Sequence, residues 1–107
     1  MSYDMRLVID TGGEYPACVT GDYRNPTYNL APMFRRALGC PIRELDGMTG
    51  AQAAPIVATG LERMRADKAG HEALNPPNGW GDYAGAVATL EWLHGACIAH
   101  PKATVRI

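Results

Sequence analysis

The chain has 107 residues, the size of one domain. Hydrophobic residues make up 47% and charged residues 20%, which is typical of a soluble globular protein and excludes a disordered or collagen-like chain. The 10 basic residues nearly balance the 11 acidic ones, for a net charge of −1. That balance argues against a dedicated nucleic-acid binder and against a polyanionic mimic of DNA. We expect residues 1–107 to form a single small domain.

Signals for export or membrane insertion are missing from the sequence. No run approaches the ~20 apolar residues that span a bilayer, and no basic stretch is followed by the apolar core of a signal peptide. The three cysteines, Cys18, Cys40 and Cys97, are isolated and odd in number. These features indicate a reduced, cytoplasmic setting without membrane contact.

The first part of the chain predicts two strands and a helix. Residues 5–10 form an apolar run with β-branched members, and 17–20 can pair with them as a hairpin. A helix is predicted over 30–38, where apolar residues recur on one face. Asn29 is its predicted N-cap and Gly39 its terminating glycine.

A second helix is predicted over 50–66. Thr49 and Gln52 have the spacing of a capping box, in which each residue's side chain binds the other's backbone N–H. Pro55 interrupts this pattern, because proline removes one helical hydrogen bond. It either kinks the helix or marks its true start.

The last part of the chain predicts a third main helix and a final strand. Residues 71–74 suit one helical turn, and Asp82 suits the N-cap of a helix that runs to about Ala99. Its apolar stripe includes Ile98, and residues 103–107 read as a strand that can join the hairpin. The expected fold class is α+β, with three main helices packed on a short two- or three-stranded sheet.

Known catalytic and metal-binding patterns do not assemble in this sequence. Asp10-Thr11-Gly12 follows a strand as in retroviral-type aspartic proteases, but that fold is nearly all β and this chain has extensive helical periodicity. His94, Cys97 and His100 are three apart, yet the outer two diverge by about 120° around a helix. We therefore expect no catalytic set, no cofactor and no metal, and an enzyme is the less favoured class.

Two polar loops rich in aromatic residues are the most unusual features. They span 23–29 and 75–83, and each mixes tyrosine or tryptophan with asparagine just before a predicted helix. Exposed aromatic residues beside polar ones are typical of recognition surfaces. The candidate binding residues are Tyr28, Asn29, Asn78, Trp80, Asp82 and Tyr83.

A purely structural interpretation of the same loops stays open. Asn29 and Asp82 can act only as helix caps, and Tyr28 and Trp80 can pack over the helix starts. Trp92 lies off the main stripe of its helix and either covers the short sheet or takes part in a protein contact. The sequence is also compatible with a homodimer, because a small domain gains buried surface from self-association.

The same loops resemble a group of small uncharacterised proteins of bacteriophages and prophages, notably of actinobacteria. The resemblance covers most of residues 22–107, and its patterns lie at 27–33 (Thr-Tyr-Asn-x-x-Pro-Met), 45–47, 74–83 (with Asn-Pro-Pro-Asn-Gly-Trp-Gly-Asp-Tyr) and 100–105. The family carries no established activity, so it assigns no catalytic residue. It implies a phage accessory protein that is made inside a bacterial cell.

These observations lead to two functional expectations. The first is a small accessory protein that binds a host or phage protein through the polar aromatic loops, with inhibition of a defence system as the process in view. The alternative is a small-ligand or nucleotide-binding protein, or a minimal enzyme, that uses the same loops as a polar pocket. A ligand-dependent rise in melting temperature would favour the alternative.

Overall fold

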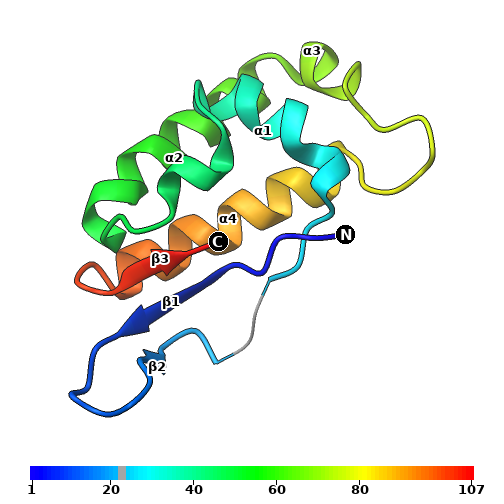
Figure 1. The fold of residues 1–107 in the computed structure, drawn as a ribbon. Coiled ribbons are helices and arrows are strands. Elements are labelled where there is room, and N and C mark those ends of the chain that lie inside the picture. The colour runs from blue at the N-terminus through cyan, green and yellow to red at the C-terminus, as the bar shows by residue number, and fades with distance from the viewer. Residues whose placement is uncertain (22–23) are drawn as a thin grey trace.

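Three short strands form one antiparallel sheet in the computed structural model, which describes residues 1–21 and 24–107 (Figure 1). The central strand β1 (Arg6–Ile9) pairs with β2 (Ala17–Cys18) on one edge and with β3 (Thr104–Arg106) on the other. The predicted hairpin and the C-terminal strand are confirmed. All the helices lie on one side of this sheet (Figure 1).

The second strand is shorter than predicted, since it ends at Cys18 and the sequence indicated 17–20. The Val19 N–H still donates to the Leu7 carbonyl, at 2.9 Å between nitrogen and oxygen. Gly21 then takes a positive φ of 76°, and Arg24 pairs with Met5, just before β1, as an isolated antiparallel bridge.

The first helical segment differs from the prediction at its start. A 3₁₀ turn, η1 (Tyr28–Leu30), precedes α1 (Ala31–Leu38). Asn29 is not the N-cap of α1: Thr27 caps the 3₁₀ turn, and its hydroxyl accepts from the Asn29 backbone N–H at 3.3 Å. The prediction was wrong because it could not foresee the extra turn, which places Asn29 inside the helical segment.

The second main helix, α2 (Gly50–Ala66), follows a short 3₁₀ turn, η2 (Ile42–Leu45). The capping box between Thr49 and Gln52 is confirmed in both directions. Helix α2 starts at Gly50, so Pro55 lies inside it and does not mark its start. Pro55 is exposed to solvent.

The next helix is a short one, α3 (Lys68–Glu72), and it begins earlier than the predicted turn at 71–74. Its N-cap is Asp67, whose carboxylate accepts from the Gly70 N–H at 3.1 Å. This cap was not predicted, because Asp67 directly follows the predicted helix over 50–66 and was assigned to its end.

The last helix, α4 (Tyr83–Ala99), is capped by Asp82 as predicted, with the Gly85 N–H donating to its carboxylate at 2.8 Å. Ile98 does not belong to the buried stripe of α4, because 62% of its surface is exposed. It lies about 100° around the helix axis from the buried Cys97. The prediction of Ile98 as a core residue was therefore wrong.

The hydrophobic core lies between the sheet and the helices. Leu7 on β1 and Val105 on β3 are direct partners in the sheet, and both are fully buried. The helices contribute mainly Phe34, Leu45, Val57, Met64, Leu90 and Leu93. Among the residues that the structure describes, no helix is long and apolar enough to cross a membrane.

Candidate functional site

The two polar loops meet in the folded chain. Gly81 lies so close to the first loop that a Cβ atom there would come within 2.7 Å of the Thr27 Cγ2 and 3.0 Å of the Leu30 Cγ. Its backbone φ of 98° is also one that L-residues rarely adopt. Glycine at 81 therefore allows the loop before α4 to pack directly on the loop before α1.

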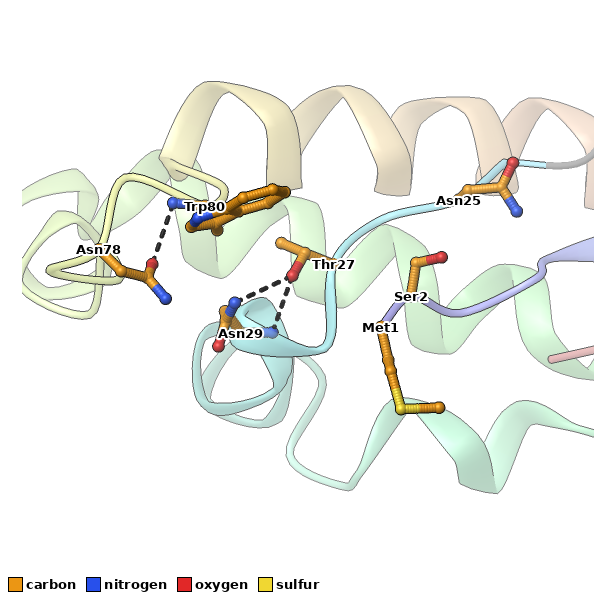
Figure 2. A pocket seen from close by; sticks show the side chains of 7 residues that line it. All are labelled: Met1, Ser2, Asn25, Thr27, Asn29, Asn78 and Trp80. Atoms are coloured by element: carbon orange, nitrogen blue, oxygen red, sulfur yellow. Dashed lines mark hydrogen bonds between the residues drawn. The ribbon is translucent and has the colours of Figure 1, made fainter.

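The junction of these loops forms an open hollow of about 480 Å³ on the surface, which we call the Trp80 hollow (Figure 2). Its volume falls within the roughly 300–1,000 Å³ of small-molecule sites. The residues that line it are Met1, Ser2, Asn25, Thr27, Asn29, Asn78 and Trp80. Three of the six predicted binding residues, Asn29, Asn78 and Trp80, thus share one site.

Trp80 is the dominant side chain of this hollow. Of its surface, 69% is exposed, although the residue lies in a defined turn. The Asn78 side-chain carbonyl accepts from the Trp80 backbone N–H at 3.0 Å (Figure 2), and Gly79 between them has a positive φ of 75°. The turn therefore fixes the Trp80 backbone, and most of the indole stays exposed to a partner.

The amide side chains around Trp80 are held by hydrogen bonds that leave polar atoms available. The Asn29 Nδ2 donates to the Thr27 hydroxyl at 3.1 Å (Figure 2), and the Asn25 Nδ2 donates to the Asp4 carboxylate. Within the described part of the chain, the Asn29 Oδ1 and the Asn78 Nδ2 have no hydrogen-bond partner. The hollow therefore offers one acceptor, the Asn29 Oδ1, and one donor, the Asn78 Nδ2, for hydrogen bonds to a ligand or partner.

The side chains that line the hollow are polar or apolar and carry no charge. None of the side chains that line it is ionisable, since they are one methionine, one serine, one threonine, three asparagines and one tryptophan. Recognition of phosphate normally uses arginine, lysine or a metal ion. The lining is therefore suited to neutral hydrogen-bonding groups, such as peptide amides, together with an apolar surface for the indole.

Tyr28 points away from the Trp80 hollow. Its ring packs edge-on against Tyr3, with 4.6 Å between the ring centroids, and its hydroxyl accepts from Arg43 at 2.9 Å. Burial is the main cause that raises the pKa of Tyr3, and the nearby Arg43 charge partly opposes it. Tyr28 fastens the first loop to the N-terminal segment.

Tyr83 and Asp82 also have structural contacts. The Tyr83 hydroxyl donates to the Met64 carbonyl at 2.8 Å, and its backbone N–H donates to the Asn75 side chain at 2.8 Å. Asp82 caps α4. Each of the two interpretations from the sequence thus describes part of the loops: some residues fasten them, and others face outward.

Besides Thr27, the hollow is lined by three residues that were not predicted as binding residues: Met1, Ser2 and Asn25. Met1 and Ser2 are brought there because Ser2 pairs with Thr27 as an isolated antiparallel bridge. Asn25 lies in the first polar loop, and its amide side chain was the one feature of the sequence that could have indicated it as a binding residue. Tyr23, the first residue of that loop in the sequence analysis, lies outside the described residues.

The other candidate centres have ordinary structural roles. Cys97 is fully buried, and burial raises the pKa of its thiol to about 11, so the thiol is protonated at neutral pH. In residues 1–21 and 24–107, no group of three or more histidine, cysteine or acidic side chains could hold a metal ion. Trp92 is partly buried against the core and borders a hollow with Val19 and Thr20, next to β2.

Comparisons with known proteins found nothing that assigns a family. No protein-family model, curated protein or solved structure matches the chain. Any functional assignment therefore depends on the geometry and chemistry of the Trp80 hollow.

Proposed function

We propose that this chain is a small, non-enzymatic binding protein of the phage accessory type. It acts in the cytoplasm of a bacterial cell by holding a host or phage protein, and inhibition of a defence system is the role we favour. The observation that carries the proposal is Trp80, which is 69% exposed on a turn whose backbone is fixed by the Asn78 side chain.

The energetics of an exposed tryptophan favour a protein partner. Covering a large aromatic side chain contributes about 1.5–3 kcal/mol through removal of its apolar surface from water. Tryptophan is enriched among the few residues that dominate binding energy at protein interfaces. Because the Asn78 hydrogen bond already fixes the backbone of the turn, little backbone entropy is lost there when a partner binds.

The amides beside Trp80 supply specificity in this proposal. The Asn29 Oδ1 can accept from a partner's backbone N–H, and the Asn78 Nδ2 can donate to a partner's carbonyl. Since no lining side chain is charged, the matching surface of the partner is uncharged where it enters the hollow.

A small neutral ligand is the second candidate, and the volume of about 480 Å³ favours it. Nucleotides fit less well than other ligands, because no lining side chain is cationic and could bind their phosphates. Such a ligand would raise the melting temperature of the purified chain in a concentration-dependent way. This rise would occur without any partner protein.

The test compares three forms of the tagged protein in bacterial host lysate: wild type, Trp80→Ala and Tyr15→Ala. Tyr15 is a matched control, because it is an aromatic residue that is 77% exposed in the β1–β2 loop and does not line the hollow. The captured protein is identified and purified, and its Kd is measured with each form.

We expect Trp80→Ala to weaken the Kd by about 30-fold, which corresponds to the loss of about 2 kcal/mol that defines a dominant interface residue. Tyr15→Ala should bind as the wild type does. A partner that binds folded Trp80→Ala with unchanged affinity would show that the hollow is not the contact surface.

A further inference from the structure

A second hollow, of about 350 Å³, lies beside the start of α1 and shares no lining residue with the Trp80 hollow. We call it the arginine hollow. It is lined by Tyr3, Ala31, Pro32, Arg35, Pro41, Ile42 and Arg43. Most of these are apolar, and two are cationic, so the lining combines an apolar surface with positive charge.

Arg43 is held in a defined position by aromatic side chains. Its guanidinium carbon lies 5.1 Å from the centroid of the Tyr3 ring and 5.3 Å from that of Tyr28. One guanidinium nitrogen donates to the Tyr28 hydroxyl at 2.9 Å. Guanidinium groups stack well on aromatic faces and keep their remaining N–H donors in a rigid fork. Arg43 is therefore oriented before any ligand binds.

The positive charge at this hollow is not neutralised by neighbouring acids. In the part of the chain that the structure describes, neither Arg35 nor Arg43 forms an ion pair. Glu44, which follows Arg43, does not line the hollow; with burial as the larger cause, its charge raises the pKa of the Cys40 thiol. Arginines elsewhere do pair with acids, as in Arg36–Asp67, Arg65–Glu91 and Arg106–Asp46.

The donors that remain at the hollow are the two guanidiniums and the first N–H groups of η2. Pro32 and Pro41 have no N–H group to donate, and the Ala31 N–H is bonded to the Tyr28 carbonyl. Ile42 and Arg43 begin η2, so their N–H groups have no acceptor within that turn. The fork of an arginine binds carboxylate and phosphate alike. The mostly apolar lining favours a carboxylate, because its smaller charge costs less to remove from water.

The lining opposite the arginines is apolar. Pro32 and Pro41 are exposed and Ala31 is half-buried, so these residues present the apolar surface, whereas Ile42 and Tyr3 are nearly fully buried. We propose that the arginine hollow binds a small organic monocarboxylate with an aromatic or branched apolar body. Its carboxylate lies between Arg35 and Arg43, and its apolar body covers Pro32 and Pro41.

The experiment titrates the purified chain with phenylacetate and, in parallel, with its neutral isostere phenylacetamide. Binding is followed by NMR through the methyl signals of Ala31 and Ile42, which line the hollow. The variants are Arg35→Gln and Arg43→Gln, and Arg65→Gln is the matched control, because Arg65 pairs with Glu91 away from the hollow.

We expect phenylacetate to shift these methyl signals at millimolar concentration, with phenylacetamide binding at least about tenfold more weakly. Arg35→Gln and Arg43→Gln should each weaken phenylacetate binding about tenfold, as for loss of one charged hydrogen bond. Arg65→Gln should leave it unchanged. Because Arg43 also touches the tyrosine cluster, Arg35→Gln provides the test that does not depend on that packing.

Four results would overturn the proposal: no methyl shifts with phenylacetate, equal binding of the acid and the amide, unchanged binding of phenylacetate by Arg35→Gln, or equal weakening by Arg65→Gln. Trp80→Ala should bind phenylacetate as the wild type does, since the two hollows share no lining residue. Failure of this proposal is therefore separable from failure of the proposed partner binding.

Discussion

Substituting Gly81 by alanine tests whether the two loops pack as the structure shows, and Gly79 offers a matched control. Both glycines have a positive φ, of 98° at Gly81 and 75° at Gly79, so alanine is strained at either position. Only at Gly81 would the new Cβ also meet a neighbour, the Thr27 Cγ2 at 2.7 Å. At Gly79 nothing lies within 4 Å. The difference between the two variants therefore measures the contact between the loops.

The expected sizes follow from these two contributions. An L-residue in the left-handed region costs about 1–2 kcal/mol, which applies to both variants. Insertion of a methyl group into a packed contact adds about 1–3 kcal/mol, which applies to Gly81→Ala alone. For a chain of this size, 1 kcal/mol corresponds to about 4 °C in Tm. We expect Gly79→Ala to lower the Tm by about 4–8 °C and Gly81→Ala by about 8–20 °C.

The assay is thermal unfolding of wild type and both variants, followed by circular dichroism of the helices. A second readout is partner binding, which Gly81→Ala should weaken because it displaces the Trp80 turn from Thr27. If the two variants melt within about 1 °C of each other, the close approach of Gly81 to the first loop is not present in solution, and the account of the Trp80 hollow fails.

Three further predictions concern the supports of the site and the titratable groups. Tyr83→Phe removes the hydrogen bond to the Met64 carbonyl and should lower the free energy of unfolding in urea by about 1 kcal/mol, whereas Tyr15→Phe should not change it. The pKa of Asp67 is lowered, first by the hydrogen bond from Arg36 and then by that from the Gly70 N–H. The ionised Asp67 therefore stabilises the fold fully above the usual pKa of about 3.9, and this effect is lost as the pH falls through the lower folded pKa. The Tm of the wild type should accordingly fall more than that of Asp67→Asn between about pH 7 and about pH 3, and equal falls would contradict this. Burial raises the pKa of Cys97 to about 11. A thiol reagent at about pH 8 should therefore label Cys18 and Cys40 in the folded chain, and Cys97 only after denaturation. Rapid labelling of Cys97 in the native chain would show that the core is open there.

Features that depend on a few neighbouring residues could be predicted from the sequence. The capping box at Thr49 and Gln52 and the cap at Asp82 involve partners only three residues away, so residue order alone indicates them. The same local reasoning failed at Asn29, because the competing Thr27 cap begins an extra 3₁₀ turn. It failed at Ile98 because the apolar character of a residue does not say where its helix meets the core.

The candidate site, too, could be predicted from the sequence only in part. Both loops could be selected from the sequence by their composition of tryptophan, tyrosine and asparagine. Which of those residues face outward could not be predicted. Tyr28 and Tyr83 are half-buried, and their hydroxyls bind Arg43 and the Met64 carbonyl, which are both distant in sequence.

The sequence by itself thus determined the α+β class, the three main helices and the two loops that contain the site, since hydrophobic period and helix caps are local properties. Only the tertiary structure decided that Asn29, Asn78 and Trp80 share one hollow, and that Arg35 and Arg43 border another. The physical reason is that these residues come from separate elements. Their proximity depends on the packing of the helices and the sheet into one core, and on close approaches such as that of Gly81 to Thr27.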